Sequence, residues 1–191
     1  MSSFVLSRSF PLSRVVAALG LLAAAAASAH ADTFMDDKWA QQVCSQWNQN
    51  QTLTNDLGGK DGWVANNGGK GYKALQMYRD GCGASTRVEL DIAPKDGKAM
   101  CVYAGPVKTT KLNSSVDYLM HASDADWTCM GKGSWGCGAM GAMMSGKLQF
   151  EGPKMEAANV MGPFGDFLLL TGKVASSKSS CPGGGKVASA K

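Results

Sequence analysis

Residue types that perform acid–base chemistry are rare in this chain of 191 residues. Beyond residue 31 it has a single histidine, His121, with Asp124 and Asp126 close behind it. An imidazole beside carboxylates can act as a general base. However, no Gly-x-Ser-x-Gly elbow is present and the cysteines are expected to be oxidised, so no nucleophile accompanies the histidine. We interpret His121 as a surface residue and both aspartates as helix-capping acids, and we predict no catalytic residue and no enzymatic activity.

The cysteines are the second group with chemical potential. They are Cys44, Cys82, Cys101, Cys129, Cys137 and Cys181. An even number of cysteines in an exported chain indicates disulfides. Cys129 and Cys137 bracket a glycine-rich segment, and a bridge from Cys44 to Cys82 would join the first predicted helix to the end of the second. These two pairs are hypotheses. Paired Cys-x-x-Cys spacing is missing, so we predict no metal site and no cofactor.

Methionines form a third group, with eleven in the chain and all but Met1 beyond residue 31. Met140, Met143 and Met144 cluster just before an alternating segment. Thioether side chains adapt to irregular apolar surfaces, including those of ligands, and they also bind Cu(I). Three interpretations stay open: ordinary core packing, the lining of an apolar pocket and, more weakly, a methionine and cysteine module for copper.

The first 31 residues are typical of a secretory signal peptide. Arg8 and Arg14 precede an apolar run over 15–27, which is short for a membrane span, and Ala29-His30-Ala31 fits a cleavage site. The long alanine run is typical of bacteria. We therefore predict cleavage after about Ala31 and a periplasmic location.

Helical spacing dominates the start of the mature chain. Met35, Trp39 and Val43 recur every four residues, which predicts a helix over 33–49. A glycine-rich loop follows, and a second short helix is predicted over 71–79. Residues 32–82 are thus expected to be the helical part of a single domain over 32–175.

Strand periodicity follows in residues 84–175, where the sheet and a C-terminal helix are expected. Apolar residues alternate over 88–92 and 100–104 around the turn 94–97, which predicts a hairpin. They alternate again over 116–121 and 146–151. Each strand has one apolar face that helices must cover, so we predict an α+β fold with a mainly antiparallel sheet.

Capping residues and prolines delimit the later helices. Ser123 is a good N-cap for a helix that reaches Met130. Pro153 can open an apolar helix that Gly162-Pro163 should kink or split. The last part, residues 176–191, is rich in Ser, Lys and Gly, and we expect a flexible tail unless Cys181 anchors it.

The segment 142–152 reads Ala-Met-Met-Ser-Gly-Lys-Leu-Gln-Phe-Glu-Gly, and it follows a helix start at Ser123-Asp124-Ala125-Asp126-Trp127 and a glycine-bearing loop. Over about residues 86–174 this order resembles the sterol carrier protein type 2 sterol-binding domain family. The resemblance implies a sheet of about five strands whose helices enclose an apolar pocket or tunnel for fatty acyl chains, sterols or other lipids, without catalysis. Export, six cysteines and the glycine-rich 127–141 segment depart from the family pattern.

Aromatic and apolar side chains concentrate on both sides of that strand, where they can line the pocket. The predicted lining residues are Trp127, Trp135, Met140, Met143, Met144, Leu148, Phe150, Met161, Phe164, Phe167 and Leu168.

Charge excludes one class of partner. Removing Arg8 and Arg14 from the net charge of +4 leaves +2 without a dense basic block, so we predict no nucleic-acid binding. We expect a protein that binds or transfers a lipid, sterol or fatty-acyl ligand and transiently contacts a membrane or an envelope protein. The alternatives are a disulfide-stiffened accessory protein of an envelope complex and the copper module.

Overall fold

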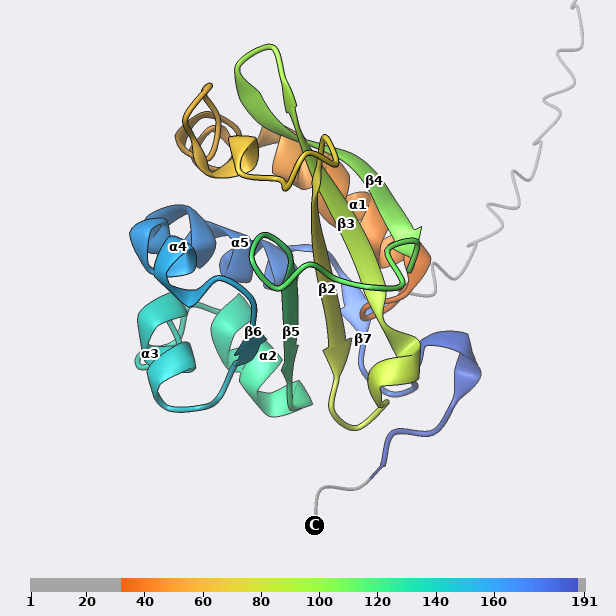
Figure 1. The fold of residues 1–191 in the computed structure, drawn as a ribbon. Coiled ribbons are helices and arrows are strands. Elements are labelled where there is room, and N and C mark those ends of the chain that lie inside the picture. Colours follow the sequence, from red (N-terminus) through yellow and green to blue (C-terminus); the bar gives the residue numbers. More distant parts are fainter. Residues whose placement is uncertain (1–31, 189–191) are drawn as a thin grey trace, which may run out of the picture. The chain divides into compact units, whose positions relative to one another are not determined.

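The computed structural model of the chain describes residues 32–188 (Figure 1). The predicted signal peptide, residues 1–31, and the last three residues of the predicted tail lie outside the described residues. Within 32–188, no helix combines the length and the apolar character that crossing a bilayer requires.

A five-stranded sheet, ordered β4-β3-β2-β5-β6, is the frame of the fold. Its strands are β2 (Lys73–Arg79), β3 (Val88–Lys95), β4 (Lys98–Pro106), β5 (Tyr118–Ala122) and β6 (Gln149–Glu151). Neighbours pair antiparallel except β2 and β5, which are parallel. The predicted α+β class with a mainly antiparallel sheet of about five strands is confirmed.

The central strand β2 occupies the place where a helix over 71–79 was predicted, and that prediction is wrong. Its Leu75 and Met77 alternate onto the buried face, between Lys73 and Arg79 on the same face. The charged ends hide the two-residue period from an apolar pattern. Pairing with β3 on one side and β5 on the other then overrides local helix propensity.

The predicted hairpin is confirmed in β3 and β4. Lys95 pairs with Lys98 across a two-residue turn, in which Asp96 and Gly97 have φ values of 51° and 74°. Asp-Gly is the dipeptide that favours such a turn. The strand predicted over 116–121 is β5, whereas the strand predicted over 146–151 shortens to the three-residue edge strand β6.

The first helix, α1 (Asp37–Gln49), starts later than the predicted 33–49. Asp36 is its N-cap and accepts a hydrogen bond from the Trp39 backbone N–H at 2.8 Å. Asp32 and Thr33 instead form β1 (Asp32–Thr33), which pairs with β7 (Ser176–Ser177). Helix α1 lies behind β3 and β4 in Figure 1 and buries Trp39, Ala40, Val43 and Trp47.

Four helices follow β5. They are α2 (Asp124–Gly131), α3 (Ala139–Met144), α4 (Lys154–Asn159) and α5 (Met161–Lys173). Ser123 caps α2 as predicted and accepts from the Asp126 N–H. The apolar helix after Pro153 is split, but the break falls at Val160 rather than at Gly162-Pro163. Pro163 fits the first turn of α5 because no intrahelical hydrogen bond needs its missing N–H.

Short helical turns complete the chain. They are the π-helical η1 (Thr52–Asp56) and the 3-10 turns η2 (Trp63–Ala65), η3 (Ala84–Thr86) and η4 (Pro182–Gly184).

Three disulfides join all six cysteines. The predicted Cys129–Cys137 bridge is present, but the Cys44–Cys82 hypothesis is wrong. Cys44 bonds to Cys101 because α1 packs along β4. Cys82, just past the end of β2, bonds to Cys181.

The C-terminal segment is expected to be flexible unless Cys181 anchors it. The Cys82–Cys181 bridge provides that anchor. Arg79 adds to it, because its guanidinium donates to the carbonyls of Lys178 at 2.7 Å and Ser180 at 2.6 Å. The same guanidinium forms a two-pronged ion pair with Asp124, at 2.6 Å in each bond. The C-terminal segment is thereby tied to both β2 and α2.

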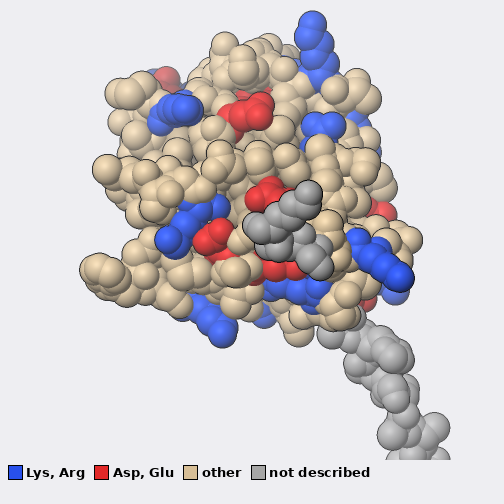
Figure 2. Space-filling view, turned by 90° about the horizontal axis from the view of Figure 1, so that it is seen from below, with Lys and Arg blue, Asp and Glu red and all other residues tan. Residues whose placement is uncertain are grey.

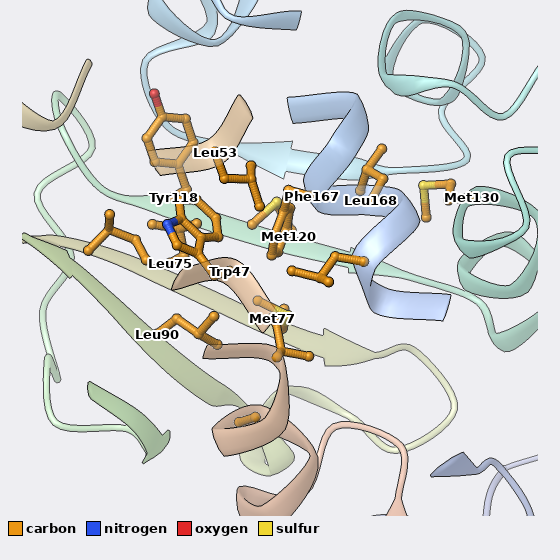
Figure 3. Packing of buried hydrophobic residues seen from close by; sticks show 14 of the residues in the cluster. Trp47, Leu53, Leu75, Met77, Leu90, Tyr118, Met120, Met130, Phe167 and Leu168 are labelled. Carbon is orange, nitrogen blue, oxygen red and sulfur yellow. The ribbon is translucent and has the colours of Figure 1, made fainter. Parts of the chain in front are cut away.

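The hydrophobic core lies between the sheet and helices α1 and α5 (Figure 3). The Trp47 indole donates to the Ala99 carbonyl at 2.9 Å and meets the Phe167 ring edge-on at 5.7 Å. These contacts join α1, β4 and α5 in one core.

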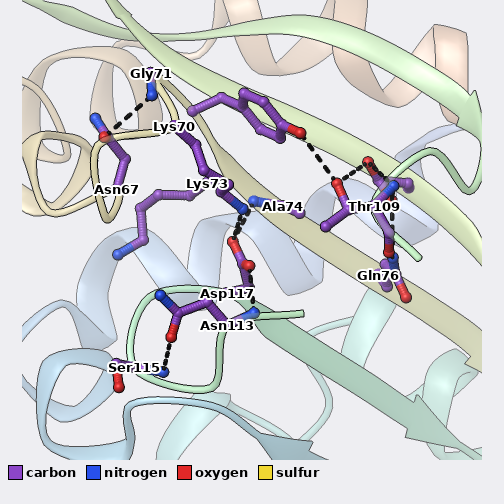
Figure 4. A network of polar contacts seen from close by, with 12 residues as sticks. Asn67, Lys70, Gly71, Lys73, Ala74, Gln76, Thr109, Asn113, Ser115 and Asp117 are labelled. Atoms are coloured by element: carbon purple, nitrogen blue, oxygen red, sulfur yellow. Dashed lines mark hydrogen bonds and ion pairs between the residues drawn. The ribbon is translucent and has the colours of Figure 1, made fainter. Parts of the chain in front are cut away.

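The opposite face of the sheet is polar and is crossed by the 107–117 loop. Glu89 is buried there and accepts from Gln76, from the Thr109 N–H and from the Thr109 hydroxyl. Asp117 accepts from Lys70, Ala74 and Asn113 (Figure 4). These two carboxylates fasten the loop to the strands. On the molecular face drawn in Figure 2, acidic and basic side chains are interspersed rather than gathered by sign.

Asp91 lies beside Glu89 on this face, and its Oδ1 has no hydrogen-bond partner among the described residues. Burial, together with the Glu89 carboxylate, raises the pKa of Asp91 to about 7. Two buried carboxylates this close resist a second negative charge.

Replacing Cys82 and Cys181 by Ser should lower the free energy of unfolding more than replacing Cys129 and Cys137. The bridges span 99 and 8 residues, and chain entropy assigns about 4.7 kcal/mol to a loop of about 100 residues and about 2.6 kcal/mol to a loop of about nine. Urea titration of both double variants measures the difference. An equal loss, or the reverse order, contradicts this prediction.

Asp91 should make stability depend on pH. The folded state keeps its proton up to about pH 7, whereas the unfolded chain releases it near its ordinary pKa of 3.8. The folded state binds more protons in that window, so the free energy of unfolding falls as pH rises from about 4 to 7. Urea titrations should give a smaller fall for Asp91→Asn, while the exposed-site control Asp61→Asn should keep the wild-type slope.

Candidate ligand-binding site

An apolar cavity lies between the sheet and the helices α1, α4 and α5. Its volume is about 20 Å³, enough for the centre of about one water molecule. Five of its lining residues are aromatic. The lining is Trp47, Leu57, Trp63, Leu75, Tyr118, Met120, Ala157, Val160, Pro163, Phe164 and Phe167. In this structure the cavity is therefore nearly filled by its own side chains.

A buried lysine stands at the rim of this cavity. Lys73, on β2, has a side chain that is 0% exposed. Its ammonium donates to the Asn66 carbonyl at 2.8 Å and lies over the Trp63 ring at 4.7 Å and the Tyr118 ring at 5.3 Å. Ring faces attract a cation, but they do not neutralise it.

Glu156, on α4, supplies the neutralising charge. The Lys73 ammonium donates to both of its oxygens, at 2.7 and 2.9 Å. The same carboxylate accepts from the Asn66 side-chain amide at 2.7 Å and from the Tyr118 hydroxyl. The Trp63 indole donates to the Tyr118 hydroxyl at 2.8 Å, so the polar atoms of both rings belong to this cluster. Figure 3 shows the Tyr118 hydroxyl pointing away from the apolar side chains.

Burial and the charge of Glu156 oppose each other in the pKa of Lys73 and add together in the pKa of Tyr118. Burial lowers the pKa of Lys73, and the Glu156 carboxylate opposes that shift. Burial and the Glu156 carboxylate both raise the pKa of Tyr118, so the hydroxyl stays a donor. Breaking a buried pair by removing one partner costs about 3–5 kcal/mol, because it leaves an uncompensated charge. The Lys73 position thus requires an anion.

Helix α4 closes the cavity on the side of Glu156. It has six residues, and its one buried residue is Ala157. Gly152, with φ 139°, and Pro153 precede it, and Val160 interrupts the helical path after it. The helix is short because both flanks break the hydrogen-bond ladder. The carboxylate of Glu156 bonds it to β2 and β5.

A second hollow, a groove of about 300 Å³, opens on the surface beside the cavity. It gathers six of the predicted lining residues. They are Met140, Met143, Met144, Leu148, Phe150 and Met161. The Phe150 ring also meets the rings of Tyr118 at 5.3 Å and Phe164 at 6.0 Å, both of which line the cavity. Phe150 therefore connects the lining of the groove to two aromatic rings of the cavity.

The other five predicted lining residues lie in three places: in the cavity, in the core and on the surface. Phe164 and Phe167 line the cavity. Leu168 and Trp127 are buried in the core but line neither hollow, because Trp127 packs against Phe34 and donates to the Tyr78 carbonyl. Trp135 is fully exposed, at 101%, and its prediction as a lining residue is wrong.

The acid–base residues singled out in the sequence have structural partners. His121 pairs with Asp80 at 2.6 Å through Nδ1 and stacks on Tyr78. Asp124 pairs with Arg79, and Asp126 accepts from the Ser123 hydroxyl. The two aspartates thus serve the start of α2, as predicted.

Residues 32–188 offer few side-chain groups that could bind a metal ion. No group of three or more His, Cys, Asp and Glu side chains there is arranged to hold an ion. All six cysteines are in disulfides, which removes the thiolates from the copper alternative and leaves only its thioethers.

Comparison of the fold with solved structures finds similar chains. A crystal structure of sterol carrier protein 2 is 18% identical with a TM-score of 0.45, over 74% of this chain and 98% of that chain. The solution structure of a conserved hypothetical protein from Thermus thermophilus, described as a possible sterol carrier protein, is 20% identical with a TM-score of 0.46, over 78% and 96%. The apo form of sterol carrier protein 2 from Yarrowia lipolytica is 16% identical with a TM-score of 0.31, over 72% and 82%.

Comparisons with family models and with curated protein sequences give no match.

Sequence reasoning missed the polar half of the site. Lys73 falls in the segment 71–79 that is predicted as a helix, and no sequence pattern singles out Glu156. The two residues are 83 positions apart, so no local pattern connects them. One signal was available in the sequence. Lys73 and Arg79 follow the same two-residue period as Leu75 and Met77, which places all four on one face of a strand.

Proposed function

We propose that this protein is a non-catalytic carrier that binds a lipid, sterol or other hydrophobic ligand in the aromatic-lined cavity beneath α4. The observation that carries the proposal is the cavity itself. Its lining is apolar, its nearest polar groups converge on one side, and the ring of Phe150, which lines the surface groove, contacts the cavity residue Tyr118. Such a site binds by enclosure and holds no nucleophile.

The cavity must enlarge to hold a ligand, since about 20 Å³ is far below the size of a lipid chain. Helix α4 and Phe150 are the elements that can yield, because α4 is short and Phe150 is half-buried. Burying the apolar surface of the ligand contributes roughly 25 cal/mol per Å², from which the costs of association are subtracted.

The location that fits this role is the periplasm. A chain whose first 31 residues have the pattern of a signal peptide is exported, and three disulfides are compatible with an oxidising compartment. A carrier there moves apolar molecules through water between two surfaces.

Filling the cavity should abolish binding. Ala157→Leu adds three carbon atoms at the buried lining position of α4, and we expect it to weaken binding of the neutral fluorescent probe N-phenyl-1-naphthylamine by about tenfold or more. Asn159→Leu, at an exposed position of α4 that lines neither the cavity nor the groove, is the control and should bind like wild type. Native mass spectrometry of protein purified without detergent measures carried lipid. A wild-type protein that is empty and binds neither this probe nor a fluorescent sterol refutes the proposal.

Transfer requires contact with a donor or acceptor, and one face suits a lipid surface. Trp135, Met140, Met144 and Met155 are four of the five exposed large apolar side chains of the described residues. All of these except Met155 lie in the 131–150 segment. That segment also contains Lys132 and Lys147 and has no Asp or Glu. Apolar side chains among lysines match an anionic phospholipid surface. Met140 and Met144 also line the groove, so the groove opens beside these two exposed side chains.

Vesicle sedimentation tests that contact. Wild type should bind vesicles that contain phosphatidylglycerol, and binding should weaken in high salt because lysines contribute. The double variant Trp135→Ser with Met144→Ser should bind about fivefold less. Val102→Ser removes the fifth exposed apolar side chain, from β4, and serves as the control. Equal binding of both variants, or no preference for phosphatidylglycerol, contradicts this use of the face.

A further inference from the structure

Three donors from three parts of the chain converge on one carboxylate at the cavity rim. They are the Lys73 ammonium on β2, the Tyr118 hydroxyl on β5 and the Asn66 amide after η2. Lys73 and Tyr118 belong to the sheet, and Asn66 follows a 3-10 turn, whereas the acceptor, Glu156, belongs to α4. The donors thus form a fixed anion site whose occupant sits on another element.

The occupant also closes the cavity. Ala157 and Val160, one and four residues after Glu156, line the cavity. Withdrawing Glu156 from its donors therefore frees the anion site and removes part of the cavity wall in one movement. Tyr118 belongs to both, because its ring lines the cavity and its hydroxyl binds the carboxylate.

We infer that Glu156 stands in for the carboxylate of a ligand, and that the preferred ligand is a single-chain amphiphile with a carboxylate head. This inference rests on the proposed function and deepens it. The ligand carboxylate accepts from Lys73, Tyr118 and Asn66, and its chain enters the cavity between Trp47, Phe164 and Phe167. The displaced Glu156 moves to solvent with α4.

The charge of the site selects a monoanion. Lys73 is the one cation bound to Glu156, and the nearby Lys70 is already paired with Asp117 at 2.6 Å. One lysine balances one carboxylate and not a phosphate dianion. Two oxygens also suffice, since Lys73 contacts both and the other donors take one each. A neutral head leaves the buried ammonium without a counter-charge, which disfavours it.

Displacement of N-phenyl-1-naphthylamine by hexadecanoate and by hexadecan-1-ol tests the inference, because the two ligands share a chain and differ in the head. Wild type should bind hexadecanoate about tenfold more tightly than the alcohol. Glu156→Gln removes the internal competitor and should tighten hexadecanoate binding about fivefold while changing alcohol binding less than about twofold. Glu151→Gln, at the exposed acid of β6, is the matched control and should leave both affinities at wild-type values.

Lys73→Met alone leaves Glu156 unpaired, so the charge-neutral double variant Lys73→Met with Glu156→Leu is the second arm. It should bind both ligands equally, within about threefold, and its binding of the alcohol shows that it is folded. Unchanged hexadecanoate binding in Glu156→Gln, or a retained tenfold preference in the double variant, overturns the inference and leaves the carrier function standing. If the probe, the alcohol and hexadecanoate all fail to bind wild type, the proposed function is overturned and the inference with it.

Discussion

Two cations buried on the core face of β2 constrain the rest of the structure. Lys73 and Arg79 stand at opposite ends of this central strand, and both side chains are fully buried. Each needs a carboxylate, because an uncompensated charge in the core is costly. Glu156 reaches one from α4 and Asp124 reaches the other from the start of α2. The helical half of the chain is thereby fixed to the sheet at two points, with the apolar core between them.

Local chemistry explains which elements could be predicted from the sequence. Asp96-Gly97 prescribes its own turn, and Ser123 caps its own helix, so both features need only neighbouring residues. Strand β2 pairs with residues 11 to 43 positions away in the sequence, and the carboxylates that bind its charged ends lie 45 and 83 positions away. Its assignment as a helix failed because tertiary pairing decided its conformation.

In the site, too, local patterns predict some residues, and only tertiary contacts bring the others together. Phe164 and Phe167 were found because an apolar helix must bury its face. The network of Lys73, Glu156 and Tyr118 could not be found, since it appears only when β2, β5 and α4 meet. The methionines before β6 line the groove and not the cavity. An apolar sequence pattern identifies apolar surfaces but does not show which of them are exposed to solvent.

The anchoring of the C-terminal segment has a consequence for biogenesis. Arg79 lacks two of its acceptors until Lys178 and Ser180 have been synthesised and delivered, and Cys82 waits for Cys181 over the same interval. The middle of the sheet is therefore completed only after residues 99 to 101 positions further along the chain have been made. Loss of residues 178–181 therefore removes two hydrogen bonds and one disulfide from the end of the central strand.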